Sequence, residues 1–177
     1  LSGRRYAATG HANCESISVD LDLERRASLV IVVDPSGTFS ESTTEARTYE
    51  RLPVDPDWAV KDHDGTILFD RLCDWSLEPG WELFSGTLSY YAQLDVPKAA
   101  EVWLDLGSVG DIAEGLVDGD AIGASLWAPH RIDLSSVKAG PHDLEVRVTN
   151  SMANEYEGTQ SPSGLMGPVS LEASRGQ

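Results

Sequence analysis

Positive charge is scarce in this sequence. Its 13 Lys and Arg residues face 29 Asp and Glu residues, so the formal net charge is −16. A surface of that sign repels polyanions such as nucleic acid, and it also repels anionic membrane surfaces. We therefore expect neither nucleic acid nor a membrane as a partner, and we interpret the acidic surface mainly as a source of solubility.

Long apolar runs, a leader sequence and abundant cysteine are missing too. The sequence has no run of about 18 apolar residues, so it predicts no segment that spans a bilayer. It begins at Leu1 without a visible signal peptide, which indicates a piece of a longer protein and leaves its location, cytoplasmic or secreted, open. Cys14 and Cys73 are the two cysteines, and two free thiols are favoured over a disulfide because a domain of this length has enough core without one.

The sequence also lacks the short motifs of common enzymes. It contains no Gly-x-Ser-x-Gly nucleophile elbow, no glycine loop for phosphate, and no Cys-x-x-Cys or His-Glu-x-x-His zinc pattern. Carboxylates are plentiful, but a glycosidase pair is defined by its separation in space, so abundance alone does not indicate catalysis.

Short apolar stretches are present instead, and Gly, Pro, Asn and Asp interrupt them at near-regular intervals. Alternation of apolar and polar residues predicts strands with one buried face, and many such strands joined by tight turns predict an all-β sandwich. No segment predicts a convincing helix, so residues 150–163 are interpreted as a long polar loop and residues 1–13 as irregular. The predicted strands are residues 88–96, 101–106, 132–134, 144–148 and 169–173, together with residues 16–23 paired with 29–33. Residues 58–61 and 66–69 are predicted to form a hairpin across residues 62–65, and residues 115–123 a hairpin across Asp118-Gly119.

The loop of residues 126–131 combines an aromatic ring, an imidazole and a guanidinium group. Such a loop suits a sugar, because a flat ring packs on the apolar face of a pyranose while charged donors bind its hydroxyl groups. In the alternative interpretation, which we favour, Trp127 plugs the end of the sandwich and Arg131 pairs with a nearby acid. Loops gather at one rim of a jelly roll, so the long loop is expected to add contacts. The candidate ligand-binding residues are Trp127, His130, Arg131, Asn150, Asn154 and Tyr156.

Residues 99–130 are rich in acids and contain no Lys or Arg. Hard oxygen ligands of this kind suit calcium, although their spacing matches no known calcium loop. A solvated acidic edge that resists strand-to-strand aggregation is the favoured interpretation, and a structural calcium ion is the alternative. No other cofactor is expected. The acids concerned are Glu101, Asp105, Asp111, Glu114, Asp118 and Asp120.

Six motifs between residues 58 and 173 occur in the order of a known domain family. They are Phe84-Ser-Gly-Thr, Leu104-Asp-Leu-Gly, Val117-Asp-Gly-Asp-Ala-Ile-Gly, Trp127-Ala-Pro-His-Arg-Ile-Asp-Leu, Leu144-Glu-Val-Arg-Val-Thr-Asn and Ser163-Gly-Leu-Met-Gly-Pro-Val. The segment resembles the galactose-binding-like domains of multidomain glycoside hydrolases, above all the C-terminal β-sandwich of large bacterial α-L-rhamnosidases. It is also similar to the sugar-binding domains of the β-galactosidase and β-glucuronidase family. The family usually has Asn where Asp118 stands and often Tyr where His130 stands.

The resemblance implies an all-β, galactose-binding-like jelly-roll β-sandwich. It implies one domain over residues 1–177, in which residues 46–177 form the core and residues 1–45 add strands or belong to a preceding domain. It also implies a non-catalytic module of a larger bacterial glycoside hydrolase, since the catalytic residues of these enzymes lie on a separate barrel. Such a module binds a glycan or serves as an accessory to the catalytic domain. The alternative is a structural module that packs against that domain without affinity for sugar.

Overall fold

The computed structural model describes residues 10–12, 17–19, 31, 48–54 and 57–174, and the chain divides into two compact units, Leu1–Thr48 and Tyr49–Gln177. In the first unit, β1 (Gly10–Ala12) pairs antiparallel with β2 (Ile17–Val19). The expectation that residues 1–13 are irregular is therefore wrong for β1. The predicted pairing of residues 16–23 with 29–33 lies largely outside the described residues. The assignment of residues 1–45 to this domain or to a preceding one stays a prediction.

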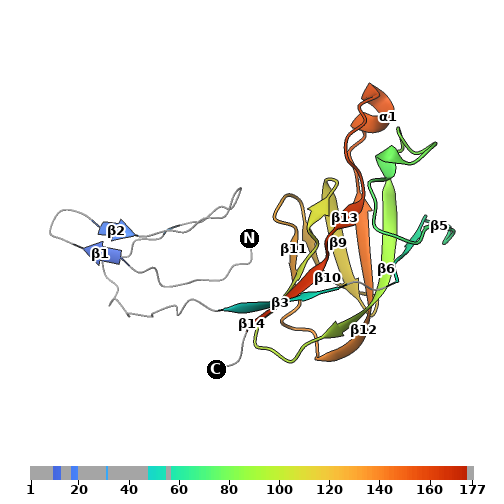
Figure 1. Cartoon of the computed structure of the whole chain (residues 1–177). Coiled ribbons are helices and arrows are strands. Elements are labelled where there is room, and N and C mark those ends of the chain that lie inside the picture. Colours follow the sequence, from blue (N-terminus) through green and yellow to red (C-terminus); the bar gives the residue numbers. More distant parts are fainter. Residues whose placement is uncertain (1–9, 13–16, 20–30, 32–47, 55–56, 175–177) are drawn as a thin grey trace. The chain divides into compact units, whose positions relative to one another are not determined.

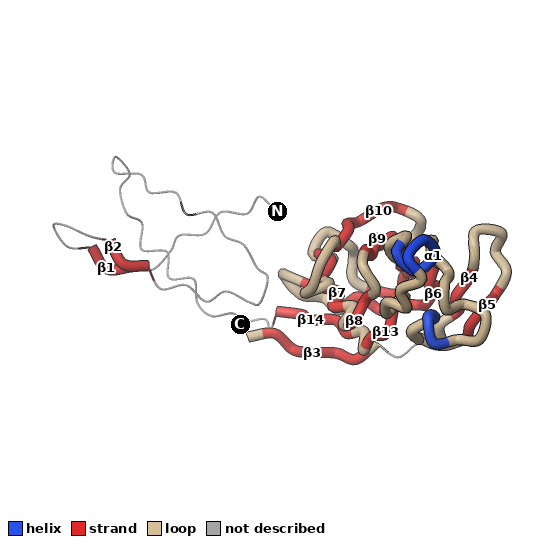
Figure 2. The backbone as a smooth tube through the Cα atoms, turned by 90° about the horizontal axis from the view of Figure 1, so that it is seen from above, coloured by secondary structure: helices blue, strands red, loops and turns tan. Residues whose placement is uncertain are grey.

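The second unit is a β-sandwich, which confirms the predicted fold class (Figures 1 and 2). One sheet has six strands in the order β10-β9-β12-β6-β4-β5, the other has four in the order β11-β7-β14-β3, and β13 pairs with β8. The bounds in the six-stranded sheet are β4 (Ala59–Lys61), β5 (Ile67–Phe69), β6 (Thr87–Val96), β9 (Ile112–Val117), β10 (Asp120–Ser125) and β12 (Gly140–Thr149). The remaining strands are β3 (Tyr49–Pro53), β7 (Val102–Asp105), β8 (Ser108–Val109), β11 (Arg131–Asp133), β13 (Leu165–Gly167) and β14 (Ser170–Ser174).

The core lies between the two sheets and follows the period of two read from the sequence. Every second residue of β6 from Leu88 to Val96 is buried, and so are Leu144, Val146 and Val148 of the neighbouring β12. These side chains share one apolar cluster with residues of the four-stranded sheet, among them Val102, Leu104, Ile132 and Leu171. Alternation along a strand places one face on the core, and this is the main physical reason that the sequence folds as a sandwich.

Two predicted hairpins are confirmed. β4 and β5 pair across residues 62–65, and β9 and β10 pair across Asp118 and Gly119. Asp118 has a φ of 52° and Gly119 a φ of 86°, the left-handed conformations that a type I′ turn requires at both central positions.

The interpretation of residues 150–163 as a loop without a helix is wrong. It contains the short helix α1 (Ala153–Glu157), which ends at Gly158 in the left-handed conformation (φ 64°) that commonly closes a helix. A 3₁₀ turn, η1 (Trp75–Leu77), also forms between β5 and β6, where the carboxylate of Asp74 accepts from the backbone N–H of Ser76. No helix in the described part of the chain has the length and apolar character needed to cross a membrane.

Strand pairing brings several loops to one end of the sandwich. Thr149 of β12 lies opposite both Thr87, which begins β6, and Ile112, which begins β9, while Ser125 at the end of β10 lies opposite Ala113. The loops of residues 81–86, 106–111, 126–130 and 150–164 therefore share this end, which we call the upper rim. In Figure 1 the helix α1 marks it. The predicted ligand-binding residues lie in these loops or directly beside them.

Candidate functional site at the upper rim

The side chain of Asn150 joins three segments of the upper rim. It is buried, its Oδ1 accepts from the backbone N–H of Gly86 at 2.8 Å, and its Nδ2 donates to the carbonyl of Phe84 at 2.9 Å. The same Nδ2 donates to Ser163 Oγ at 2.9 Å. The amide is thus engaged on both sides within the chain, and it fixes the loop of residues 81–86 against the loop that follows β12.

Asn154 closes the long loop onto itself. Its side chain is fully buried, Nδ2 donates to the carbonyl of Ser161 and to Ser163 Oγ, both at 3.2 Å, and Oδ1 accepts from the backbone N–H of Ser161 at 3.2 Å. The structure therefore places the amides of Asn150 and Asn154 beneath the rim surface, where they position backbone.

The loop of residues 126–130 holds its tryptophan outward. Trp127 is 61% exposed, so the alternative in which it plugs the end of the sandwich is wrong. Ser125 Oγ donates to the carbonyl of Trp127 at 3.2 Å and lies 3.1 Å from Nδ1 of the buried His130. Because the serine proton is directed to that carbonyl, we assign the proton of this contact to His130 Nδ1. The carbonyl of His130 accepts from Leu106 N–H at 2.9 Å, so both ends of the loop are anchored.

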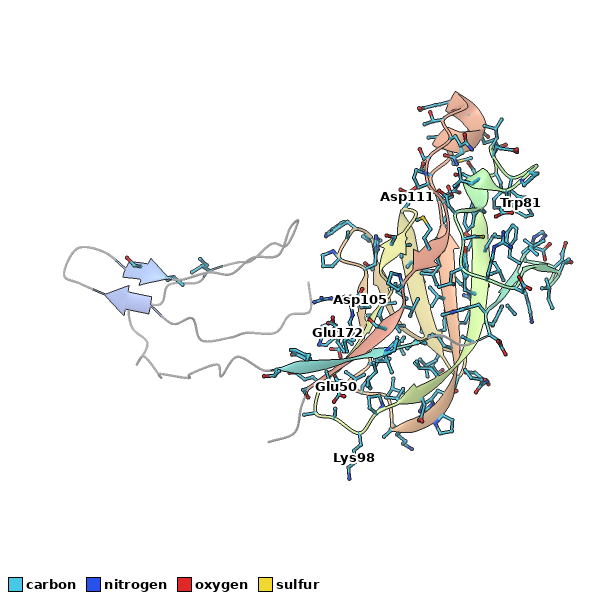
Figure 3. The ribbon with its side chains drawn as sticks, in the orientation of Figure 1. Glu50, Trp81, Lys98, Asp105, Asp111 and Glu172 are labelled. Carbon is cyan, nitrogen blue, oxygen red and sulfur yellow. The ribbon has the colours of Figure 1, made fainter. Side chains whose placement is uncertain are left out.

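Arg131 begins β11 and lies among acids, as expected from the interpretation in which this arginine pairs with a nearby acid. Its Nη2 is 3.4 Å from Glu172 Oε2 and its Nε is 3.8 Å from Asp105 Oδ2. Arg51 of β3 also pairs with Asp105 at 2.5 Å. Figure 3 shows Asp105 and Glu172 close together on the adjacent strands β7 and β14. The guanidinium group of Arg131 is thus directed into an ion-pair network on the four-stranded sheet.

Tyr156 is the second exposed aromatic side chain among the predicted residues. It lies on α1 and is 73% exposed. Of the six predicted residues, Trp127 and Tyr156 are those with more than half of their surface accessible. Sequence reasoning missed the large aliphatic side chains that are exposed on the rim loops or next to them. They are Leu77, Leu83, Leu126 and Met152. The sequence feature that could have indicated their exposure is their position outside the strands, where no alternation of apolar and polar residues predicts burial.

The acids considered for calcium do not gather into a site. Among the described residues, no group of three or more His, Cys, Asp or Glu side chains lies close enough to hold a metal ion. Asp105 pairs with arginines, and Asp118 Oδ2 lies 2.6 Å from His142 Nδ1 at the opposite end of the sandwich. The hydrogen bond from His142 lowers the pKa of Asp118 and raises the pKa of His142 itself.

Burial raises the pKa of two side chains beneath the rim, Tyr90 and Cys73. Burial raises the pKa of the Tyr90 hydroxyl, which accepts from the backbone N–H of Leu165 at 3.0 Å. Burial, followed by the charge of Glu78, raises the pKa of Cys73, a half-buried free thiol. Cys14 lies outside the described residues. A thiol with a raised pKa is a poor nucleophile, so we assign Cys73 no chemical role.

A shallow groove of about 460 Å³ lies on the outer face of the six-stranded sheet. Leu116, Ala121 and Ala124 contribute apolar side chains to it, and Glu114 and Arg147 contribute charges. None of the six predicted ligand-binding residues lines this groove. The rim loops and the groove are therefore separate candidate surfaces, and the exposed aromatic side chains named above belong to the rim.

The comparisons with known proteins point to glycoside hydrolases. No known family model matches the sequence. A protein of Formosa agariphila assigned as a β-glucuronidase is 39% identical over 102 residues, which cover 53% of this chain and 9% of that protein. A rhamnosidase structure from Novosphingobium sp. PP1Y matches with a TM-score of 0.57 and 28% identity, over 88% of this chain and 17% of that one. A GH2 β-galacturonidase from Eisenbergiella tayi matches with a TM-score of 0.56 and 20% identity, over 72% of this chain and 25% of that one.

These similarities confirm the predicted resemblance to a domain of a multidomain glycoside hydrolase. The chain spans less than a third of the length of each of these relatives. The activity of a whole enzyme therefore does not transfer to it.

Proposed function

We propose that this chain is a non-catalytic carbohydrate-binding module of a larger glycoside hydrolase and that its upper rim binds the glycan. The observation that carries the proposal is the exposed indole of Trp127 on a loop whose backbone is fixed through Ser125 and His130. A fixed aromatic face costs little conformational entropy on binding and offers a large apolar contact to a sugar ring. Tyr156 on α1 offers a second exposed ring on the same rim.

Neither of the two carboxyl groups whose pKa is shifted among the described residues, Asp118 and Glu145, has the electrostatics of a glycosidase acid. A glycosidase needs one carboxylic acid whose pKa is raised so that it donates a proton at neutral pH. The carboxyl groups of Asp118 and Glu145 have shifts of the opposite sign. Burial alone raises the pKa of Glu145, but hydrogen bonds from Arg147, Ser89 and Tyr91 together lower it below its ordinary value.

The test of the proposal is calorimetric titration of the protein with a panel of oligosaccharides. We expect weak, saturable binding of at least one of them, and we expect Trp127→Ala to reduce its affinity at least about tenfold while the melting temperature stays unchanged. Tyr49→Ala is a suitable control, because Tyr49 is a partly exposed aromatic residue whose pairing with Ser174 places it away from the rim. Unfolding of Trp127→Ala, or equal loss of affinity in the control, would contradict the proposal. Hydrolysis of aryl glycosides by the wild-type protein would contradict its non-catalytic part.

The second candidate is a structural module that packs against the catalytic domain without affinity for sugar. The aliphatic side chains of Leu77, Leu83, Leu126 and Met152 favour it, because exposed apolar surface often marks a protein interface. In that case no oligosaccharide binds. Replacing these four side chains with polar ones would then weaken association with the separately expressed remainder of the parent enzyme, while Trp127→Ala alone would change that association little.

A further inference from the structure

The four loops of the upper rim carry charge of one sign. Residues 81–86, 106–111, 126–130 and 150–164 contain the carboxylates Glu82, Asp111, Glu155 and Glu157 and no lysine or arginine. All four residues are exposed, and Asp111 is visible at the upper end of the sandwich in Figure 3. His130, which is the histidine of these loops, is buried and its Nδ1 faces Ser125. A ligand that approaches the rim therefore meets a negative surface.

Arg131, which directly follows the loop of residues 126–130, is paired with acidic side chains of the four-stranded sheet. Arg131 lies between Asp105 and Glu172, at 3.8 Å and 3.4 Å from their carboxylate oxygens. Carboxylate recognition in proteins typically uses an arginine fork or a lysine ammonium that the ligand can reach. To bind a sugar carboxylate, Arg131 would have to give up its contacts with two protein carboxylates, which would then share Arg51 as their described partner.

From this charge distribution we infer that the rim binds neutral glycans and rejects glycans that carry uronic acids. The inference rests on the proposed function and specifies the class of its ligand. Exposed charges act over about 8–10 Å at physiological salt, which is the scale of one or two sugar rings. A uronate placed on Tyr156 therefore experiences repulsion from Glu155 and Glu157, its neighbours on α1, whereas a neutral pyranose keeps its stacking and hydroxyl contacts. Similar proteins are named as a β-glucuronidase and a β-galacturonidase, enzymes whose names refer to uronic acids. The ligand inferred for this rim differs from the sugars in those names.

A pair of ligands that differ only in charge tests the inference. The probes are a uronic-acid oligosaccharide and the neutral oligosaccharide obtained by reducing its carboxyl groups, each titrated into the protein at low and at high salt. We expect the neutral ligand to bind with an affinity that salt changes less than about twofold. At low salt, we expect the uronate to bind at least about tenfold more weakly than the neutral ligand. This difference in affinity should decrease at high salt, because salt screens the charges of the rim.

A charge-neutralising variant tests the assigned cause. The double substitution Glu155→Gln and Glu157→Gln on α1 should reduce the difference in affinity between the two ligands at low salt. It should leave the affinity for the neutral ligand unchanged. Glu50→Gln is the matched control, since Glu50 is exposed on β3 away from the rim (Figure 3).

The outcomes separate the two proposals. Equal or tighter binding of the uronate overturns this inference and leaves the rim a glycan site. An unchanged difference in affinity between the two ligands in the α1 variant also overturns this inference. Absence of binding by either ligand, and by a wider neutral panel, refutes the proposed function and this inference with it.

Discussion

Asn150 offers the sharpest test of how the rim is built. Replacing it with Ala removes the acceptor of Gly86 N–H and the donors to the Phe84 carbonyl and Ser163 Oγ, three hydrogen bonds of 2.8–2.9 Å. A typical hydrogen bond contributes about 1 kcal/mol net, and each buried polar group left without a partner costs about 1–3 kcal/mol. We therefore expect Asn150→Ala to lower the free energy of unfolding by about 2–4 kcal/mol, measured by urea denaturation followed by tryptophan fluorescence.

Asn150→Asp separates the hydrogen bonds from the volume of the side chain. The ionised carboxylate keeps the acceptor for Gly86 N–H but cannot donate to the Phe84 carbonyl or to Ser163. It should destabilise the protein at neutral pH about as much as Ala does, and part of the loss should return at acidic pH as the carboxyl group gains a proton. Thr159→Ala in the exposed part of the same loop is the control. A loss below about 0.5 kcal/mol for Asn150→Ala would refute the view that this amide holds the rim together.

Three further perturbations have expected outcomes. Tyr90→Phe leaves the buried N–H of Leu165 without its acceptor and should cost about 1–3 kcal/mol in urea unfolding, whereas a neutral result would mean that another group accepts from that N–H. Gly164 has a φ of 108°, and an added Cβ would lie 2.7 Å from the Tyr90 hydroxyl, so Gly164→Ala should cost at least about 2 kcal/mol or prevent folding. The hydrogen bond to Asp118 raises the pKa of His142 above 6.5, so its contribution to stability is complete below pH 6.5 and is lost as pH rises through the raised value. His142→Gln should therefore remove that fall in melting temperature at alkaline pH, and an identical pH profile in the variant would contradict the assignment.

The strands of the sandwich could be predicted because their signal is local. The alternation in residues 88–96 and 144–148 reappears as buried and accessible faces of β6 and β12. The turn of Asp118 and Gly119 is likewise specified by two neighbouring residues with left-handed backbones. Local patterns of this kind require no knowledge of the partner strand.

The roles of the rim residues could not be predicted in the same way. Asn150 is buried because its partners come from residues 84 and 86, more than 60 positions earlier in the chain, and from Ser163. Trp127 is exposed because the contacts of Ser125 and His130 hold the adjacent backbone, and composition does not reveal this arrangement. The helix α1 was missed because five residues are too few to show helical periodicity.

The central claim, that the upper rim is the part of this chain that binds sugar, is tested most directly by a ¹H–¹⁵N NMR titration with a neutral oligosaccharide. We expect saturable shifts of the Trp127 indole N–H and of backbone amides in the loops of residues 126–130 and 150–164, with β3 and the turn at residues 118–119 unchanged. Shifts confined to the groove beside Glu114 and Arg147, or no saturable shift with any sugar of a broad panel, would contradict the claim.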